Sequence, residues 1–424
     1  MTSLEIGHGI DGAVDYARLP EDLLAELLAQ TPTVVRQVRE LLGPALAARD
    51  DLRRAAERTG LINEHERGRA GSICAVDGGF AVERTIAVDL ILAVAVGVEG
   101  FLGDGGGTGW NDNQYASFHR VLPHHLDNER LARASMVAHE LAVLADSPHD
   151  VAIYDGSHLT PVIGLNIGLT ARSDQVSELS VAVAADVDLE SAFHQFVEHP
   201  SIVAMPKYDS SDDLCRLLGA ALGTTISGDD KYVTSLILRG GEYTTPQQVR
   251  PDPWRELHIT TRPGTPAELS GLPARFDALL QPLRDRQLYY VYWRPDDAAP
   301  SYRLEVKPPL AHDREALRYV LSTLAWQITG PFVREPYPQY LADVMAKSVG
   351  LGLGALQAAA HLALSRAQPE LAEYLVRSYR TEGKRAPTSP LTRPVRRSST
   401  RLQRARPFRR TRSGSWGLRA RRTS

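Results

Sequence analysis

Two short apolar runs, each ending in Asp-Gly, most constrain what this chain can fold into. The first is ICAVDGG at 73–79 and the second is VAIYDGS at 151–157. Such β-branched runs form buried strands, and glycine permits a sharp turn, so we expect a carboxylate at each strand end. If the strands are neighbours, Asp77 and Asp155 repel each other unless a cation lies between them.

A third carboxylate favours a metal site over two Asp-Gly turns that only cap core strands. Glu140 lies on the helix expected at 128–146, which leads into the second Asp strand, although a solvated helix face would also explain it. Carboxylate oxygens suit Mg²⁺ or Mn²⁺. Two such ions about 4 Å apart can clamp a scissile phosphate, and three or more carboxylates offset their charge. The pattern indicates metal-dependent phosphoryl transfer.

The charge of the chain is divided unevenly. The segment 384–424 holds 14 of the 48 Lys and Arg residues and none of the 51 Asp and Glu residues, which leaves the rest with 34 basic and 51 acidic residues, a net charge of −17. Arg, Ser, Thr and Pro dominate this segment, so we expect it to be disordered. A flexible basic tail on an acidic body favours an anionic partner, with nucleic acid as the first candidate.

Apolar periodicity predicts a mixed α/β fold. Helices are expected at 20–60, 128–146, 212–222, 314–329, 339–366 and 368–380, and strands at 73–77, 85–98, 201–207, 288–293 and 302–307. The last two strands are expected to form an antiparallel pair. Gly78-Gly79 is expected to form a turn, and 101–113 a glycine-rich loop. The segment 232–239 fits either a helix or a buried strand. The expected parts are an N-terminal helical segment at 1–70, a core at 71–383 and the tail at 384–424.

Other features exclude several protein classes. Two cysteines supply neither a zinc pattern nor a disulfide framework. The longest apolar run, 85–98, is interrupted by Asp89 and falls short of the roughly 18 residues that a membrane span needs. There is no Gly-x-Ser-x-Gly elbow and no Walker A pattern. We expect a cytoplasmic protein that neither spans a membrane nor binds ATP itself.

Taken in order, several segments resemble the NurA family of DNA-repair nucleases over about residues 70–365. They are VDGG at 76–79, the helix with Glu140, YDGS at 154–157, the strand ending in Lys207, GDDKYVTSLILRGGEYTTP at 228–246, YRLEV at 302–306 and EPYPQYLADVMAKSVG at 335–350.

The resemblance implies an RNase H-like mixed-sheet core and a Mn²⁺-dependent nuclease acting on single- and double-stranded DNA ends. It also implies a homodimer working with a hexameric HerA-type ATPase in double-strand-break resection. Asp77, Glu140 and Asp155 would bind the metal as two ions, and Asp343 would complete the catalytic set. Lys207 and Arg303 would contact DNA.

The chain departs from the family pattern at two positions. Asp343 stands where the family has histidine, and Glu335 where it has tyrosine. An aspartate can bind a metal or orient water, but it does not supply a proton near neutral pH as histidine does. Two alternatives therefore stay open: a DNA-binding or scaffolding subunit with reduced catalysis, and a phosphohydrolase that uses the same carboxylates on small phosphate esters.

Overall fold

The computed structural model describes residues 20–376, apart from 103–108, 113, 209, 250–270, 272–273, 276–277, 280, 282–287 and 331–332. The predicted tail at 384–424 and most of the glycine-rich loop at 101–113 lie outside the described residues.

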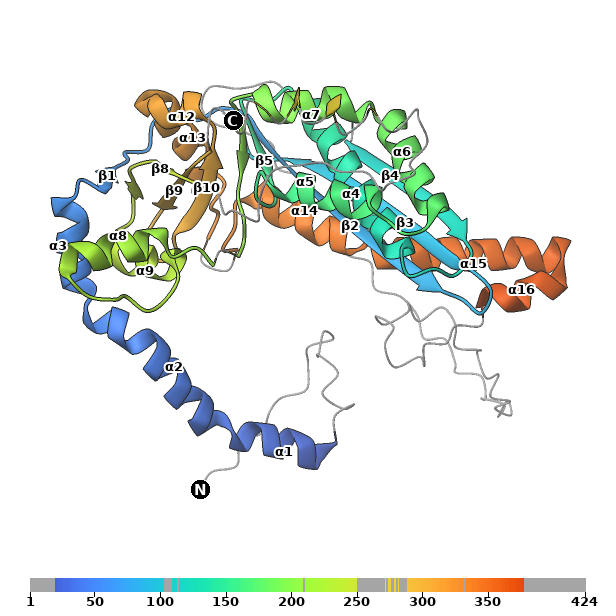
Figure 1. Ribbon diagram of the computed structural model, residues 1–424, viewed down its shortest axis with the longest axis horizontal. Helices are drawn as coiled ribbons and strands as arrows, with labels where there is room; N and C mark the ends of the chain where they lie inside the picture. Colours follow the sequence, from blue (N-terminus) through green and yellow to red (C-terminus); the bar gives the residue numbers. More distant parts are fainter. Residues whose placement is uncertain are drawn as a thin grey trace, which may run out of the picture. The chain divides into compact units, whose positions relative to one another are not determined.

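The described strands form one ten-stranded mixed sheet (Figure 1). Its order is β1-β7-β9-β10-β6-β5-β2-β3-β4, with β8 paired to β9. Strands β2, β5 and β6 are parallel, while β3 and β4 on one side and β10 and β9 on the other are antiparallel. The bounds are Ile62–Glu64 (β1), Ile73–Arg84 (β2), Asp89–Glu99 (β3), Tyr115–Leu122 (β4), Val151–Tyr154 (β5), Ile202–Ala204 (β6), Glu242–Thr244 (β7), Gln247–Gln248 (β8), Tyr289–Arg294 (β9) and Tyr302–Val306 (β10).

Helices cover both faces of the sheet, which confirms the predicted α/β class. The bounds are Glu21–Ala29 (α1), Thr31–Ala47 (α2), Arg49–Arg58 (α3), Asn128–Ala145 (α4), Thr160–Leu169 (α5), Asp174–Asp186 (α6), Leu189–Glu198 (α7), Asp213–Leu222 (α8), Asp230–Ile237 (α9), Pro308–His312 (α12), Arg314–Ala325 (α13), Tyr337–Lys347 (α14), Val349–Ala367 (α15) and Pro369–Val376 (α16). The ambiguous segment 232–239 is mostly helical, because Asp229 accepts a hydrogen bond from the Tyr232 amide and caps α9.

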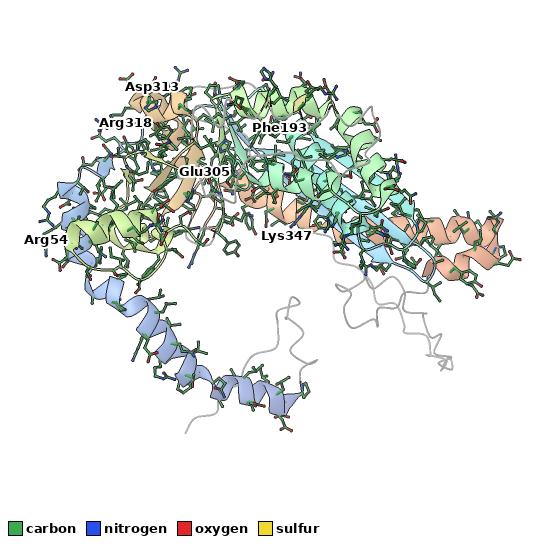
Figure 2. The ribbon with its side chains drawn as sticks, viewed as in Figure 1. Arg54, Phe193, Glu305, Asp313, Arg318 and Lys347 are labelled. Carbon is green, nitrogen blue, oxygen red and sulfur yellow. The ribbon has the colours of Figure 1, made fainter. Side chains whose placement is uncertain are left out.

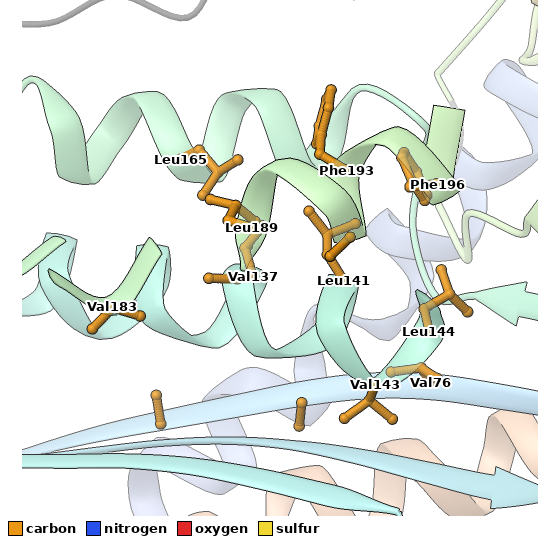
Figure 3. Close-up of a cluster of buried hydrophobic side chains, with 14 of the residues drawn as sticks. Val76, Val137, Leu141, Val143, Leu144, Leu165, Val183, Leu189, Phe193 and Phe196 are labelled. Atoms are coloured by element: carbon orange, nitrogen blue, oxygen red, sulfur yellow. The ribbon is translucent and has the colours of Figure 1, made fainter. Parts of the chain in front are cut away.

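Strand β2 separates two apolar cores because its side chains alternate between the faces of the sheet. Cys74 and Val76 pack against α4 and the helices that follow it, while Ile73 and Ala75 pack against the β9–β10 and α13 side. In the first core, Leu141 of α4 lies near Phe193 and Phe196 of α7 (Figure 3). These two layers hold β2 and β5 rigidly, and both candidate aspartates belong to this part of the sheet.

The N-terminal helices differ in how much they are buried. Helix α3 buries Leu52, Ala55 and Ala56 in a third core with α8, α9 and β9. By contrast, α1 buries no residue and α2 buries only Ala45. The apolar stripes predicted at 20–60 are therefore largely exposed on α1 and α2, with Leu28 and Leu41 more than 60% exposed.

One described stretch, Tyr337–Ala367, is long and apolar enough to cross a membrane by length and composition alone. It covers α14 and α15, and a single stretch of this kind is weak evidence for a span. Within the fold, α14 packs on β2, where Ala342 and Ala346 are fully buried. The longest apolar run in the sequence, 85–98, is a different segment, and most of it forms strand β3, Asp89–Glu99.

Candidate metal centre

Asp77 and Asp155 lie side by side, because the parallel pairing of β2 and β5 ends with Val76 opposite Tyr154. The next residue of each chain is the aspartate, and the Asp155 amide donates to the Val76 carbonyl. Asp155 follows the end of β5, as predicted. The predicted turn at Gly78-Gly79 is wrong, because β2 continues through both glycines to Arg84 and Asp77 lies inside the strand.

The two glycines after Asp77 allow helices to approach the strand closely from both faces. A Cβ on Gly78 would lie 2.3 Å from Glu140 Oε1 of α4, and one on Gly79 would lie 2.2 Å from the Ala346 carbonyl oxygen of α14. Neither contact leaves room for a side chain. The Gly-Gly pair therefore brings α4 and α14 onto β2 beside Asp77.

Helix α14 completes a group of three carboxylates. One ligand oxygen from each of Asp77, Asp155 and Asp343 lies within 4.8 Å of the others. One turn before Asp343, Gln339 donates to Asp155 Oδ1 at 3.1 Å and to the Met205 carbonyl, and this side chain is only 2% exposed. Three acidic oxygens at this spacing form a donor set that fits a divalent cation.

A lysine ammonium already neutralises part of this charge. Lys207, three residues after β6, places Nζ 2.8 Å from Asp155 Oδ2, 2.7 Å from Asp343 Oδ1 and 3.4 Å from Glu335 Oε2. Burial alone would lower the pKa of Lys207, but hydrogen bonds to Asp155 and Asp343 outweigh it and raise the pKa. The cluster thus attracts a cation in this structure, and Lys207 supplies it.

The surroundings shift the pKa values of Asp77 and Asp343 in opposite directions. Burial, and then the negative charge of Asp155, raise the pKa of Asp77 to about 7, although Lys207 opposes the shift. Asp343 behaves differently: burial works to raise its pKa, but hydrogen bonds from Lys207 and Lys347 prevail and lower it. Divalent metal binding would displace the proton from Asp77.

Glu140 lies next to the cluster but outside the group of three. It is 3% exposed on α4, and Tyr154 donates its hydroxyl to Glu140 Oε2 at 3.1 Å. Burial, followed by the charge of Asp77, raises the pKa of Glu140 well above its usual value. Glu140 therefore faces Asp77 across Gly78 and is a fourth carboxylate within reach of the centre.

Arg303 does not face solvent. It is 6% exposed on β10, stacks on the Tyr290 ring and pairs with Glu305 at 3.1 Å. Figure 2 labels Glu305 on the same strand. Glu305 in turn accepts hydrogen bonds from the Ser157 hydroxyl at 2.8 Å and the His158 amide at 3.0 Å. Rather than offering a surface to DNA, this pair supports the loop that carries Asp155.

Sequence reasoning did not find two residues that position the centre. The sequence pattern places Tyr154 in an apolar strand and Gln339 in the motif at 335–350, and it predicts no positioning role for either. A usable signal for Gln339 was its position four residues before Asp343, which places both on one helix face. No comparable pattern marks Tyr154.

Comparison with known proteins relates the fold to solved nucleases. No protein-family model and no curated protein matches the chain. The crystal structure of the NurA nuclease from Sulfolobus solfataricus matches with a TM-score of 0.51 and 13% identity, covering 77% of this chain and 92% of that one. The chain has a NurA-like fold. A NurA structure with manganese matches with a TM-score of 0.46 and 12% identity, covering 79% of this chain and 98% of that one.

Proposed function

We propose that the protein is a metal-dependent DNA nuclease of the NurA type. The observation that carries the proposal is the convergence of Asp77, Asp155 and Asp343 from β2, the end of β5 and α14, at interior strands of a NurA-like sheet. These oxygens would hold Mn²⁺ or Mg²⁺, and Glu140 would contribute to a second ion. The metal would supply Lewis-acid activation of water and stabilisation of the leaving oxygen.

The side chains around the carboxylates have separate tasks in this proposal. Gln339 fixes the orientation of Asp155 through its 3.1 Å hydrogen bond, and Tyr154 does the same for Glu140. Lys207 provides a positive charge at the centre, which suits a scissile phosphate. Asp343 would bind the metal or orient water. It would not replace histidine as a proton donor, because its lowered pKa keeps it ionised at neutral pH.

The macromolecular partners belong to the same proposal. The net negative charge of the rest of the chain disfavours DNA binding, while the 14 basic residues at 384–424 favour it. A homodimer and a HerA-type ATPase in end resection are part of the proposal. Exposed apolar side chains on the N-terminal helices, such as Leu28 on α1 and Leu41 on α2, are typical of interaction surfaces and support a protein partner. The proposed location is the cytoplasm.

Substrate choice separates the nuclease from its alternatives. Purified protein is incubated with linear plasmid DNA, single-stranded DNA and p-nitrophenyl phosphate, each with Mn²⁺, with Mg²⁺ or with EDTA. Metal-dependent loss of both DNA substrates, with little ester hydrolysis, supports the nuclease. Faster ester hydrolysis would support the small-molecule phosphohydrolase. DNA binding without cleavage in any metal would support the scaffolding subunit.

A further inference from the structure

Lys207 makes its shortest contacts with the residues that would bind the metal. Its ammonium lies 2.8 Å from Asp155 and 2.7 Å from Asp343, two of the three residues in the carboxylate group. A lysine ammonium and a divalent ion cannot both occupy the position between Asp155 Oδ2 and Asp343 Oδ1, because two positive charges at that spacing repel each other. An ion bound between these two oxygens therefore requires Lys207 to give up its contacts with them.

Glu335 offers the ammonium another partner on the same side. Its Oε2 lies 3.4 Å from Lys207 Nζ, a weaker contact than the other two. This oxygen is buried and accepts no hydrogen bond from any residue that the structure describes. A buried carboxylate oxygen without a donor is costly, and a closer approach by Lys207 would remove that cost. A short movement of the Lys207 side chain would therefore exchange its contacts with Asp155 and Asp343 for a closer contact with Glu335.

We propose that Lys207 is a built-in counter-cation that competes with divalent metal for Asp155 and Asp343, and that Glu335 receives its ammonium when metal binds. This inference rests on the proposed metal-binding function of the site. It gives the Glu at the family's tyrosine position a role of its own in this chain. After the exchange, Lys207 would remain beside the centre with its charge paired, in a position to meet a substrate phosphate.

The Mn²⁺ affinity of the full chain, prepared free of metal and measured by calorimetric titration, tests the exchange directly. Lys207→Met removes the competing charge and keeps the length of the side chain. It should bind Mn²⁺ between about tenfold and a hundredfold more tightly, because charge-assisted hydrogen bonds contribute strongly and each tenfold corresponds to 1.4 kcal/mol. Lys347→Met is the matched control, since Lys347 pairs with the other oxygen of Asp343 and is 74% exposed. Its effect should stay below about fivefold.

Glu335→Gln, made in the parent and in Lys207→Met, distinguishes two effects of Glu335 on Mn²⁺ binding. One is its role as the acceptor of the displaced Lys207 ammonium, and the other is the loss of a negative charge near the metal. In the parent, the variant should weaken Mn²⁺ binding, because the displaced ammonium loses its partner. In Lys207→Met it should change affinity little, since no ammonium has to move. Thermal unfolding with and without Mn²⁺ provides a second measurement. Without Mn²⁺, Lys207→Met should have a lower melting temperature than the parent, and adding Mn²⁺ should raise its melting temperature by more.

The possible results test the competition by Lys207, the role of Glu335 and the metal-dependent function separately. Unchanged or weaker Mn²⁺ binding by folded Lys207→Met would overturn the competition. Equal weakening by Glu335→Gln in both backgrounds would overturn the receiving role. If the folded parent binds no Mn²⁺ at all, the proposed metal-dependent function fails and the inference fails with it. If the parent binds Mn²⁺ but Lys207→Met binds it no more tightly, the inference about Lys207 is rejected while the proposed metal-dependent function stands.

Discussion

The Tyr154 hydroxyl donates a 3.1 Å hydrogen bond to Glu140 Oε2, and both side chains are at most 3% exposed. The bond joins the last residue of β5 to α4 next to Asp77. Tyr154→Phe would leave a buried carboxyl oxygen without this donor, which costs about 1–3 kcal/mol. We expect the free energy of unfolding to fall by that amount in chemical denaturation, with DNA cleavage reduced as Glu140 loses its orientation.

Tyr115→Phe on strand β4 is the control for this substitution, because Tyr115 is 72% exposed. Its free energy of unfolding should stay within about 0.5 kcal/mol of the parent. A Tyr154→Phe protein as stable and as active as the parent would show that the hydrogen bond does not support the site.

Glu305 should be a strong determinant of stability. It is 4% exposed, pairs with Arg303 and accepts bonds from the loop after Asp155. Glu305→Gln would leave Arg303 without its buried counter-charge, at a cost of about 3–5 kcal/mol. Glu315→Gln, at an exposed position in the first turn of α13, should change stability by less than about 0.5 kcal/mol. Urea denaturation of both variants checks this, and similar midpoints would contradict the assigned role.

The stability of the metal-free protein should decrease as the pH rises from about 4 to 7. Burial and Asp155 raise the pKa of Asp77 to about 7 from an ordinary value of 3.8, so the unfolded chain releases this proton first. Because the folded state then binds more protons, unfolding is favoured as pH rises through this interval, and the contribution is flat below and above it. Adding Mn²⁺ should therefore raise the melting temperature more at pH 8 than at pH 6.

Asp77→Asn should flatten this pH dependence, while Asp50→Asn at an exposed position on α3 should not. The measurement is thermal unfolding across a pH series in a metal-free buffer. An identical slope in the parent and Asp77→Asn would mean that Asp77 does not retain its proton in the folded state.

The tail should contribute DNA affinity rather than chemistry. Its 14 basic residues would release counterions on binding phosphates. Removing residues 384–424 should weaken DNA binding at low salt and flatten the salt dependence, while turnover at saturating DNA changes little. Fluorescence anisotropy over a salt series compares the two proteins, and superimposable curves would exclude the tail from DNA binding.

The sequence was sufficient to predict the α/β class and an apolar strand leading into each of Asp77 and Asp155, because apolar runs and Asp-Gly steps are local signals. Whether the two strands are neighbours depends on the parallel pairing of β2 with β5, which local signals do not fix. It could not predict that β2 passes straight through Gly78 and Gly79. The reason lies in Ala346 and Glu140, whose helices approach the strand from distant parts of the chain. Likewise, Arg303 is expected to contact DNA, and nothing local in the sequence indicates that tertiary packing buries it together with Glu305.

The most direct test of the account is Mn²⁺-dependent digestion of linear DNA by the parent, Asp77→Asn and Asp155→Asn. Each substitution keeps the shape of the side chain but removes one charge that would hold the metal, so activity should fall by a factor of about 100 or more. Far-ultraviolet circular dichroism establishes that the variants remain folded. The account predicts cleavage by the parent in Mn²⁺, none in EDTA, and almost none by either variant. Digestion by folded Asp77→Asn at the parental rate would contradict it.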